Sequence, residues 1–464
     1  MRRIVCVILT AAFCLSLVGC SSAKPKLAAK QPATVSRATS ETASVGIPST
    51  TTDTATPPAE INASKADAMR FSKPVTAVQC SDGSFMVFFA KKMVEDPGLT
   101  YHALEVRKFD KDKKLVWDQV FSHLNDVYYA VAATPDGGAL IVTDAEFKTI
   151  QGVPGSSIGY LTKISASGVV KWSDKLTKNY QYVNQIEVTP SGDIYTAGSY
   201  IGNQNDNYDR GPGGSWDHNG DDSTTVAALV RYDKNGRMKA HVISDVGYYE
   251  TLGYPQNNCF IQCKEGVGLV ADYGTCCVCY TTRLTKRWVY AYPDVPVNQD
   301  SDSAKYSAYS NMCLTKDRIV VTADSLNTIK VRRLDISFGG KLLSQTVYPS
   351  PDTLPGSLMP AMIPLPDGRC VLMMSVQGKA MAIGFFAQNK PSVFDTFGVT
   401  LHPAQVIPNL DGGFTIGYAA RNSIQEEPNY YVITRYSSAG KTEFQLISKT
   451  GNFQMLSSGL VLLF

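Results

Sequence analysis

Tight turns followed by short apolar runs recur along most of the chain. In "TPDGGALIVTDAEF" (134–147), the residues Asp136-Gly137-Gly138 can adopt a positive φ at little cost, and the run from Ala139 to Val142 favours burial. A short apolar run bounded by such a turn is typical of a buried strand. The same pattern recurs as "CSDGSFMVFFA" (80–90), "PLPDGRCVLMMS" (364–375) and "NLDGGFTIGYA" (409–419), so we predict a β-hairpin at each place.

A second hairpin follows the first one in each repeat. It consists of a strand, a tight turn and another strand. It reads "ALEVRKFDKDKKLVWD" (103–118), "GYLTKISASGVVKWSD" (159–174), "AALVRYDKNGRMKA" (227–240), "CYTTRLTKRWVY" (279–290), "IKVRRLDISFGGKLL" (329–343), "AIGFFAQNKPSVF" (382–394) and "YVITRYSSAGKTEF" (431–444). Each repeat is therefore expected to hold four strands, A to D, which is the content of one propeller blade.

The period of the repeat supports a β-propeller. Comparable turn glycines are Gly83, Gly137, Gly192, Gly266, Gly368 and Gly412, and Lys316-Asp317 fills the one missing place. Most of these intervals lie in the range of propeller blades rather than of helical solenoids. Helical periodicity is nearly absent, so we predict an all-β fold.

The number of blades is not fixed by the repeats alone. The tail "NFQMLSSGLVLLF" (452–464) reads as one more A–B hairpin, but no C–D hairpin follows it. A short strand near residues 67–73 is expected to complete this last blade from the other end of the chain. Eight four-stranded blades are therefore favoured, with seven blades and a tucked tail as the alternative.

The N-terminus predicts export and lipidation. Arg2-Arg3 precede an apolar stretch from Ile4 to Val18 that is too short to span a membrane, and Leu17-Val18-Gly19-Cys20 resembles the bacterial lipobox. We expect a signal peptide over 1–19, diacylglycerol and palmitate on Cys20, and a location on the extracytoplasmic side of the cell membrane. An ordinary secretory cleavage site is the alternative.

The chain after the lipobox divides into a tether and one domain. Residues 20–66 are mostly Ser, Thr, Ala and Pro, without an aromatic residue, which predicts a disordered tether. Residues 67–464 are expected to form a single propeller domain.

Three tryptophans occupy matching places in the D strands. Trp117, Trp172 and Trp288 are expected to pack between blades, and "VRKFDKDKKLVW" and "TKISASGVVKW" resemble the repeat of PQQ-type propellers. That superfamily includes quinoprotein dehydrogenases. It also includes the propeller lipoprotein of the outer-membrane barrel-assembly machinery, which is not an enzyme. The resemblance implies the fold and leaves both functions open.

Charge and chemistry exclude some classes of protein. The net charge is +3 and the pI is about 8.2, with acids and bases mixed, so no nucleic-acid partner is expected. Strand C carries a basic residue in six repeats, which indicates either an anion-binding ring or, as we expect, water-facing positions. These residues are Lys108, Lys163, Arg231, Arg283, Arg333 and Arg435.

No catalytic motif is evident. The chain has no CxxCH, HExxH, GxSxG or P-loop, and its five His residues are scattered, so enzyme activity is left uncertain and is not favoured. Cys276-Cys277 is similar to the vicinal disulfide of some quinoprotein alcohol dehydrogenases. A disulfide from Cys259 to the cluster Cys276, Cys277 and Cys279 stays open, as does a zinc site; free thiols are expected.

One connection between strands B and C is much longer than the others. It contains Trp216 and the residues Asp217, Asn219 and Asp221, which have the alternate-oxygen spacing of a calcium loop; Asp222, however, stands where Gly is expected. No other cofactor is expected. The D–A connections on the same rim are rich in tyrosine, including Tyr248, Tyr249, Tyr254 and Tyr306.

These residues predict the working face of the protein. We expect a monomeric binding or scaffold propeller, anchored in the membrane by its lipid, that takes a protein or polysaccharide partner on this rim. The alternative is a cell-surface enzyme, either carbohydrate-active or PQQ-dependent.

Overall fold

The computed structural model describes part of the chain. The described residues are 60–72, 74–96, 99–122, 124, 128–145, 158–176, 180–202, 224–243, 260–273, 276–292, 310–325, 330–349, 361–376, 380–387, 390–397, 400–409, 411–420, 430–448 and 453–463. The chain divides into two units, Met1–Thr51 and Thr52–Phe464, and all described residues belong to the second.

In the described part of the chain, seven four-stranded antiparallel sheets follow one another, each in the strand order A-B-C-D. The first sheet has β2 (Pro74–Gln79), β3 (Phe85–Asp96), β4 (Leu99–Phe109) and β5 (Leu115–Phe121). The second has β6 (Tyr128–Ala133), β7 (Ala139–Ala145), β8 (Ile158–Ile164) and β9 (Val170–Lys175). The third has β10 (Tyr180–Val188), β11 (Ile194–Gly202), β12 (Thr224–Tyr232) and β13 (Met238–Ile243).

The remaining four-stranded sheets have the same order. The fourth has β14 (Phe260–Lys264), β15 (Gly268–Asp272), β16 (Cys276–Tyr280) and β17 (Lys286–Ala291). The fifth has β18 (Ser310–Leu314), β19 (Arg318–Ser325), β20 (Lys330–Ser337) and β21 (Leu342–Pro349). The sixth has β22 (Ala361–Pro364), β23 (Cys370–Val376), β24 (Ala380–Ala387) and β25 (Lys390–Phe397). The seventh has β26 (Thr400–Pro408), β27 (Phe414–Ala420), β28 (Tyr430–Tyr436) and β29 (Thr442–Ser448).

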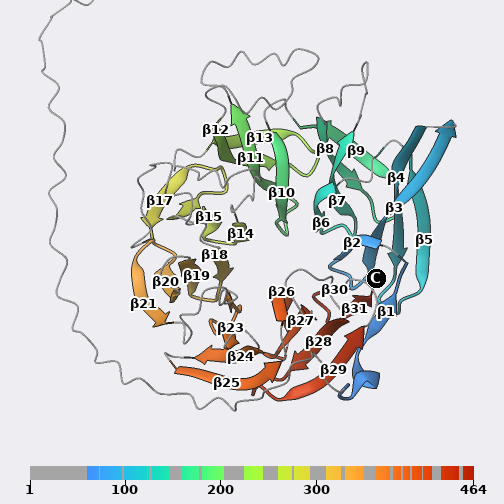
Figure 1. Cartoon of the computed structure of the whole chain (residues 1–464). Coiled ribbons are helices and arrows are strands. Elements are labelled where there is room, and N and C mark those ends of the chain that lie inside the picture. The colour runs from blue at the N-terminus through green and yellow to red at the C-terminus, as the bar shows by residue number, and fades with distance from the viewer. Residues whose placement is uncertain are drawn as a thin grey trace, which may run out of the picture. The chain divides into compact units, whose positions relative to one another are not determined.

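A three-stranded sheet, which we call the closing sheet, joins the two ends of this unit. Its order is β1 (Ala68–Arg70), β31 (Val461–Leu463) and β30 (Phe453–Met455), and β1 lies parallel to β31. Figure 1 shows this arrangement, with the red β30 and β31 beside the blue β1. The hairpin expected in the tail and the strand expected near residues 67–73 are therefore confirmed, and they pair with each other.

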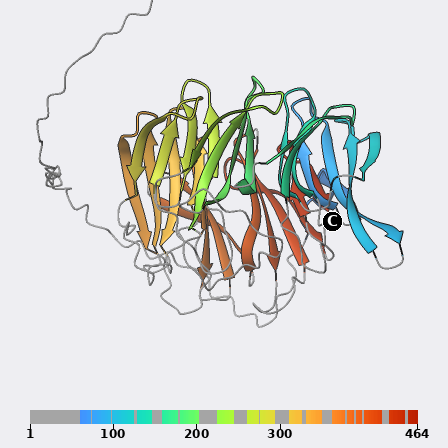
Figure 2. The same ribbon diagram turned by 90° about the horizontal axis from the view of Figure 1, so that it is seen from above.

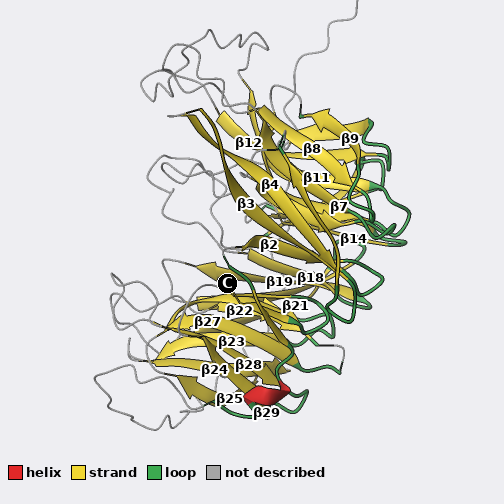
Figure 3. Ribbon diagram, turned by 90° about the vertical axis from the view of Figure 1, so that its right-hand side faces the viewer, coloured by secondary structure: helices red, strands yellow, loops and turns green. Residues whose placement is uncertain are grey.

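The predicted turns form as the glycine pattern indicates. Gly83, Gly137, Gly192, Gly266, Gly368, Gly412 and Gly459 all have positive φ between their A and B strands. Lys113 and Leu284 have positive φ in two C–D turns where other repeats have glycine. Figure 3 shows the described turns, in green, gathered at one end of the strands.

Apolar side chains fill the spaces between neighbouring sheets. Met86, Phe88 and Leu104 of the first sheet pack with Ile141 and Ile164 of the second. Comparable clusters join the second sheet to the third, the third to the fourth, the fourth to the fifth, and the sixth to the seventh. Figure 2 shows the successive sheets side by side. The all-β, propeller-like class is thus confirmed.

The closing sheet packs on both of its neighbours. Phe453, Met455 and Val461 pack with Ile433 and Phe444 of the seventh sheet. On the other side, Leu456, Leu460 and Leu462 pack with Phe85 and Val87 of the first sheet. The only helical element among the described residues is the 3₁₀ turn η1 (Ala63–Lys65), which lies against β29.

Candidate functional site

The strand order gives each sheet two ends with different connections. We call the end with the A–B and C–D turns the turn rim, and the end with the B–C and D–A connections the connection rim. The turn rim is almost wholly described, and its turns are short. The connections at the opposite rim include residues 146–157, 203–223, 244–259, 293–309, 350–360 and 421–429, all outside the described residues.

The residues predicted for the binding face all belong to those connections. Trp216, Asp217, Asn219, Asp221, Tyr248, Tyr249, Tyr254 and Tyr306 lie outside the described residues, and so does Cys20. Binding, calcium coordination and lipidation at these residues therefore stay predictions. The described strands do fix the places where the connections begin and end.

The long B–C connection of the third sheet starts and finishes at paired residues. β11 and β12 keep an unbroken antiparallel register from Ile194 opposite Tyr232 to Gly202 opposite Thr224. The two residues that flank the segment 203–223, Gly202 and Thr224, are thus paired with each other across the two strands. The sheet is complete beneath this insertion, and its pairing needs nothing from the residues in between.

At the turn rim, aspartates of the A–B turns pair with basic residues of strand C. Lys163 Nζ lies 2.7 Å from Asp136 Oδ2, and Arg435 Nη2 lies 2.7 Å from Asp411 Oδ2. The Gly413 backbone N–H and the Arg435 guanidinium hold the pKa of Asp411 below its ordinary value. These charges stabilise the turn of their own sheet and are not a convergent set.

The expectation that the strand C basic residues face water is wrong for Lys108. Lys108 is buried, and its Nζ donates hydrogen bonds to the carbonyl oxygens of Gly137 (2.9 Å) and Ala166 (3.3 Å) in the turns of the second sheet. Arg283 does not belong to strand C, because β16 ends at Tyr280. The alternation of inward and outward residues along a strand does not show whether a neighbouring sheet covers the outward residues.

The tryptophans pack between sheets as predicted. Trp117 Nε1 donates to the carbonyl oxygen of Ala166 at 2.8 Å, and Trp288 Nε1 donates to that of Phe338 at 3.0 Å. Each ring thus reaches the C–D turn of the next sheet. Their role is structural, since both the ring and its N–H are used inside the protein.

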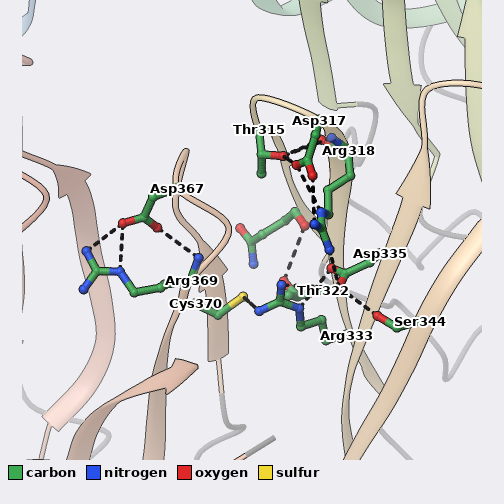
Figure 4. A network of polar contacts seen from close by, with 11 residues as sticks. Thr315, Asp317, Arg318, Thr322, Arg333, Asp335, Ser344, Asp367, Arg369 and Cys370 are labelled. Carbon is green, nitrogen blue, oxygen red and sulfur yellow. Dashed lines mark hydrogen bonds and ion pairs between the residues drawn. The ribbon is translucent and has the colours of Figure 1, made fainter. Parts of the chain in front are cut away.

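A larger polar network joins the fifth and sixth sheets (Figure 4). Arg333 Nε lies 3.0 Å from Asp335 Oδ1, and Ser344 Oγ donates to Asp335 Oδ2 at 2.7 Å. Arg333 Nη1 also reaches the Sγ atom of Cys370 at 3.5 Å. Burial raises the pKa of Cys370 to about 12, so this thiol stays protonated and is a poor nucleophile.

The cysteine cluster of the fourth sheet consists of free thiols. Cys276, Cys277 and Cys279 are buried and unbridged, which contradicts a vicinal disulfide between Cys276 and Cys277. Successive residues of a strand face opposite sides, and Cys276 and Cys277 accordingly pack in different apolar clusters. Cys259, the other half of the predicted disulfide, lies outside the described residues.

Among the described residues, no three side chains of His, Cys, Asp or Glu lie close enough together to hold a metal ion. In those residues there is also no helix with the length and apolar character needed to cross a membrane.

Sequence reasoning missed a set of polar side chains on the A strands. Gln185, Gln262, Asn311 and Gln454 each hydrogen-bond the backbone of the A strand in the next sheet. Polar residues at alternate positions of a strand normally indicate water-facing sites. The signal that could have found them is the repetition of amides, rather than charges, in these strands.

Comparisons with known proteins concern the fold. No known protein family and no curated protein matches the chain. A periplasmic gluconolactonase of Pseudomonas aeruginosa is 11% identical, with a TM-score of 0.44 over 79% of this chain and 97% of that one. The WD40 domain of Neurospora crassa Pan2 is 12% identical, with a TM-score of 0.37 over 74% of this chain and 85% of that one.

A third similar structure is prolyl oligopeptidase B of Galerina marginata. It is 11% identical, with a TM-score of 0.38 over 79% of this chain and 47% of that one. The activities named for these proteins are their own.

Proposed function

We propose that this chain is a lipid-anchored binding propeller that takes a protein or glycan partner on its connection rim. Cys20 carries the lipid, the tether after it spans the distance to the membrane, and the propeller lies on the extracytoplasmic side. The proposed partner site comprises the insertion 203–223 together with the tyrosine-rich D–A connections.

The base of the insertion is the observation that carries this proposal. Gly202 opposite Thr224 completes the β11–β12 ladder, so the sheet is finished before the insertion begins. An insertion that the fold does not require is available for another role. We propose that this role is contact with a partner, because Trp216 lies in the insertion and an aromatic side chain gives a large contact area at low entropy cost.

The contacts of the turn rim also favour a partner site on the connection rim. Its aspartates, lysines and arginines pair with one another, and Trp117 and Trp288 bind the turns of adjacent sheets. These groups are used to hold the sheets together. The rim whose residues are not repeated from blade to blade is the better candidate for a specific partner.

We also propose that the unit is a closed ring of eight blades. Gln454 of β30 bonds both the N–H and the carbonyl of Ala77 in β2, at 2.7 Å each. Gln185 makes the same pair of bonds to Ile261 between the third and fourth sheets, at 2.8 Å each. Because the junction at the chain ends repeats an ordinary junction, the closing sheet acts as a blade with three strands.

The binding role is tested by shortening the insertion. Residues 205–222 are replaced by a short Gly-Asn-Gly turn, and the matched control is Lys316→Ala, an exposed substitution on the turn rim. Wild type and both variants are immobilised and used to capture partners from detergent-solubilised envelope of the native cells. Captured proteins are identified by mass spectrometry and captured glycans by sugar analysis.

The expected result is that wild type and Lys316→Ala capture the same partner, whereas the shortened protein melts at the wild-type temperature and captures none. Capture of the same partner by the shortened protein would exclude the insertion as the binding element. Loss of the partner in Lys316→Ala alone would move the site to the turn rim.

A further inference from the structure

Amide side chains link the A strands of neighbouring sheets by taking the place of an adjacent strand. Gln185 Nε2 donates to the carbonyl oxygen of Ile261, and Gln185 Oε1 accepts from the Ile261 N–H. Gln454 does the same with Ala77. An amide has both a donor and an acceptor, so it can satisfy both backbone groups of one residue on an otherwise free strand edge.

Glu187 occupies the next position of this kind on the same strand. It lies two residues after Gln185, and its Oε1 accepts a hydrogen bond from the N–H of Cys263 at 3.4 Å. Cys263 in turn lies two residues after Ile261, so its N–H and carbonyl face the same edge of β14. An ionised carboxylate can accept from that N–H but cannot donate to that carbonyl.

Neutral Glu187 has the donor that the ionised side chain lacks. A carboxylic acid offers one O–H donor and keeps acceptor capacity, which matches the two bonds made by Gln185. Burial raises the pKa of Glu187, and this outweighs the opposite effect of the Cys263 N–H. Burial at the junction therefore favours the neutral form on energetic as well as geometric grounds.

Two ionisable side chains beside Glu187, those of Cys263 and Tyr195, keep their protons through neutral pH. Burial raises the pKa of the Cys263 thiol to about 11, and burial also raises the pKa of Tyr195, which lies opposite Glu187 on β11, to about 12. Asp193 is held in an ion pair with Arg231 at 2.9 Å. Cys263 and Tyr195 thus stay uncharged, whereas the raised pKa of Glu187 moves its own change of charge upward from the ordinary glutamate value.

We propose that Glu187 is a proton-operated clasp between the third and fourth sheets. When protonated, it donates its O–H to the Cys263 carbonyl and accepts from the Cys263 N–H, so β10 and β14 are joined at two successive positions. When it releases its proton to solvent, only the bond from the N–H remains and the junction loosens. One of the two sheets that meet at this junction, the third, also carries the insertion 203–223.

The sign of the pH effect follows from the raised pKa. Between the ordinary glutamate pKa and the raised value, the folded protein binds more protons than the unfolded chain. The contribution of Glu187 to stability is therefore fully present below the ordinary value and is lost as pH rises through the folded pKa. Glu187→Gln, which always carries a donor, removes this dependence.

Hydrogen exchange of the segment 260–264 tests the clasp. Wild type, Glu187→Gln and Gln185→Glu are compared by mass spectrometry between about pH 4 and about pH 8, with exchange corrected for its intrinsic pH dependence. We expect protection of this segment in wild type to fall about fivefold from acidic to neutral pH, as for the loss of one hydrogen bond. Glu187→Gln should stay at the acidic level throughout, and Gln185→Glu should add a second fall.

Two results with the variant Glu187→Gln would overturn the clasp. One is the same pH dependence in wild type and Glu187→Gln, which would assign the effect to another group. The other is weaker protection in Glu187→Gln than in wild type at neutral pH, which would mean that the charged carboxylate is the better partner of Cys263. The wild-type profile alone also decides against the proposal if it is flat, even where a variant fails to fold.

Discussion

Two turn glycines separate the effect of backbone conformation from the effect of packing. Gly340 has a φ of +82°, and a Cβ added there would lie 2.7 Å from Cδ2 of Trp288. Gly266 has a similar φ of +77°, but a Cβ would meet no atom within 4 Å. Both substitutions to alanine force an unfavourable conformation, and only the first also displaces the tryptophan.

We therefore expect Gly340→Ala to lower the free energy of unfolding by about 3 kcal/mol and Gly266→Ala by about 1 kcal/mol. Denaturant titrations followed by tryptophan fluorescence measure both. Equal losses would show that Trp288 moves away freely and does not fix this junction.

The amide links make a second prediction at single residues. Gln454→Ala and Gln185→Ala each remove two hydrogen bonds to a buried strand edge, so each should cost about 1–2 kcal/mol of stability. Thermal melting of the two variants checks this. A clear loss in Gln185→Ala but none in Gln454→Ala would mean that the junction between the chain ends is open in solution.

Residues of the turns could be predicted from the sequence, whereas residues of the sheet junctions could not. Gly83 and Gly137 indicate their turns in the sequence, because few other residues tolerate the positive φ that these turns require. Gln185 and Lys108 gave no such signal, since a polar side chain in a strand reads as water-facing until the neighbouring sheet is known. Their partners lie 76 and 29 residues away in the sequence, which is beyond any local pattern.

Among the elements, the segment that enters the propeller is more firmly attached than its composition indicates. We call residues 60–72 the strap. Its Ile61 exchanges two backbone hydrogen bonds with Gln445 of β29, and Asn62 Nδ2 donates to the carbonyl oxygen of Glu443. Asp67 pairs with Lys113 of the first sheet. The strap thus contacts both neighbours of the closing sheet.

Truncations from the N-terminus should distinguish the strap from the tether. In a soluble form without the signal peptide, removing residues 21–51 should leave the melting temperature unchanged. Extending the deletion to residue 66 should lower it, because the bonds to β29 are lost at about 1 kcal/mol each. Calorimetry gives both values. A fall already caused by the shorter deletion would show that residues 21–51 also contact the propeller.

The tether makes a separate prediction about location. If Cys20 carries the lipid, Cys20→Ala should move the protein from the membrane to the soluble fraction and abolish labelling by radioactive palmitate. Cell fractionation with an antibody against the propeller provides the measurement. A variant that stays in the membrane without label must be held by another contact.

The elements themselves followed from the sequence more fully than their junctions did. The tail hairpin and the strand near residue 68 could be expected because each has its own apolar run. The contact of Ile61 with β29 could not, since one isoleucine in a Ser, Thr and Pro-rich segment carries no periodic signal. The connection-rim residues, Trp216 among them, stay predictions from composition and position.

At the scale of the whole molecule, the proposed closed ring depends on the closing sheet, in which β1 pairs with the β30–β31 hairpin. The closing sheet contributes Leu456, Leu460 and Leu462 to the core shared with the first sheet. It also contributes Phe453 and Val461 to the core shared with the seventh sheet. A ring with this sheet removed would leave two apolar faces in water.

The most direct test is the melting of a protein that lacks residues 453–464, compared with one that lacks residues 21–51. Burial of several large apolar side chains is lost in the first, so we predict a fall in stability of roughly 5 kcal/mol or more and binding of an apolar dye, with no change in the second. An unchanged melting temperature after removal of 453–464 would contradict the account and leave seven sheets that hold together without the eighth.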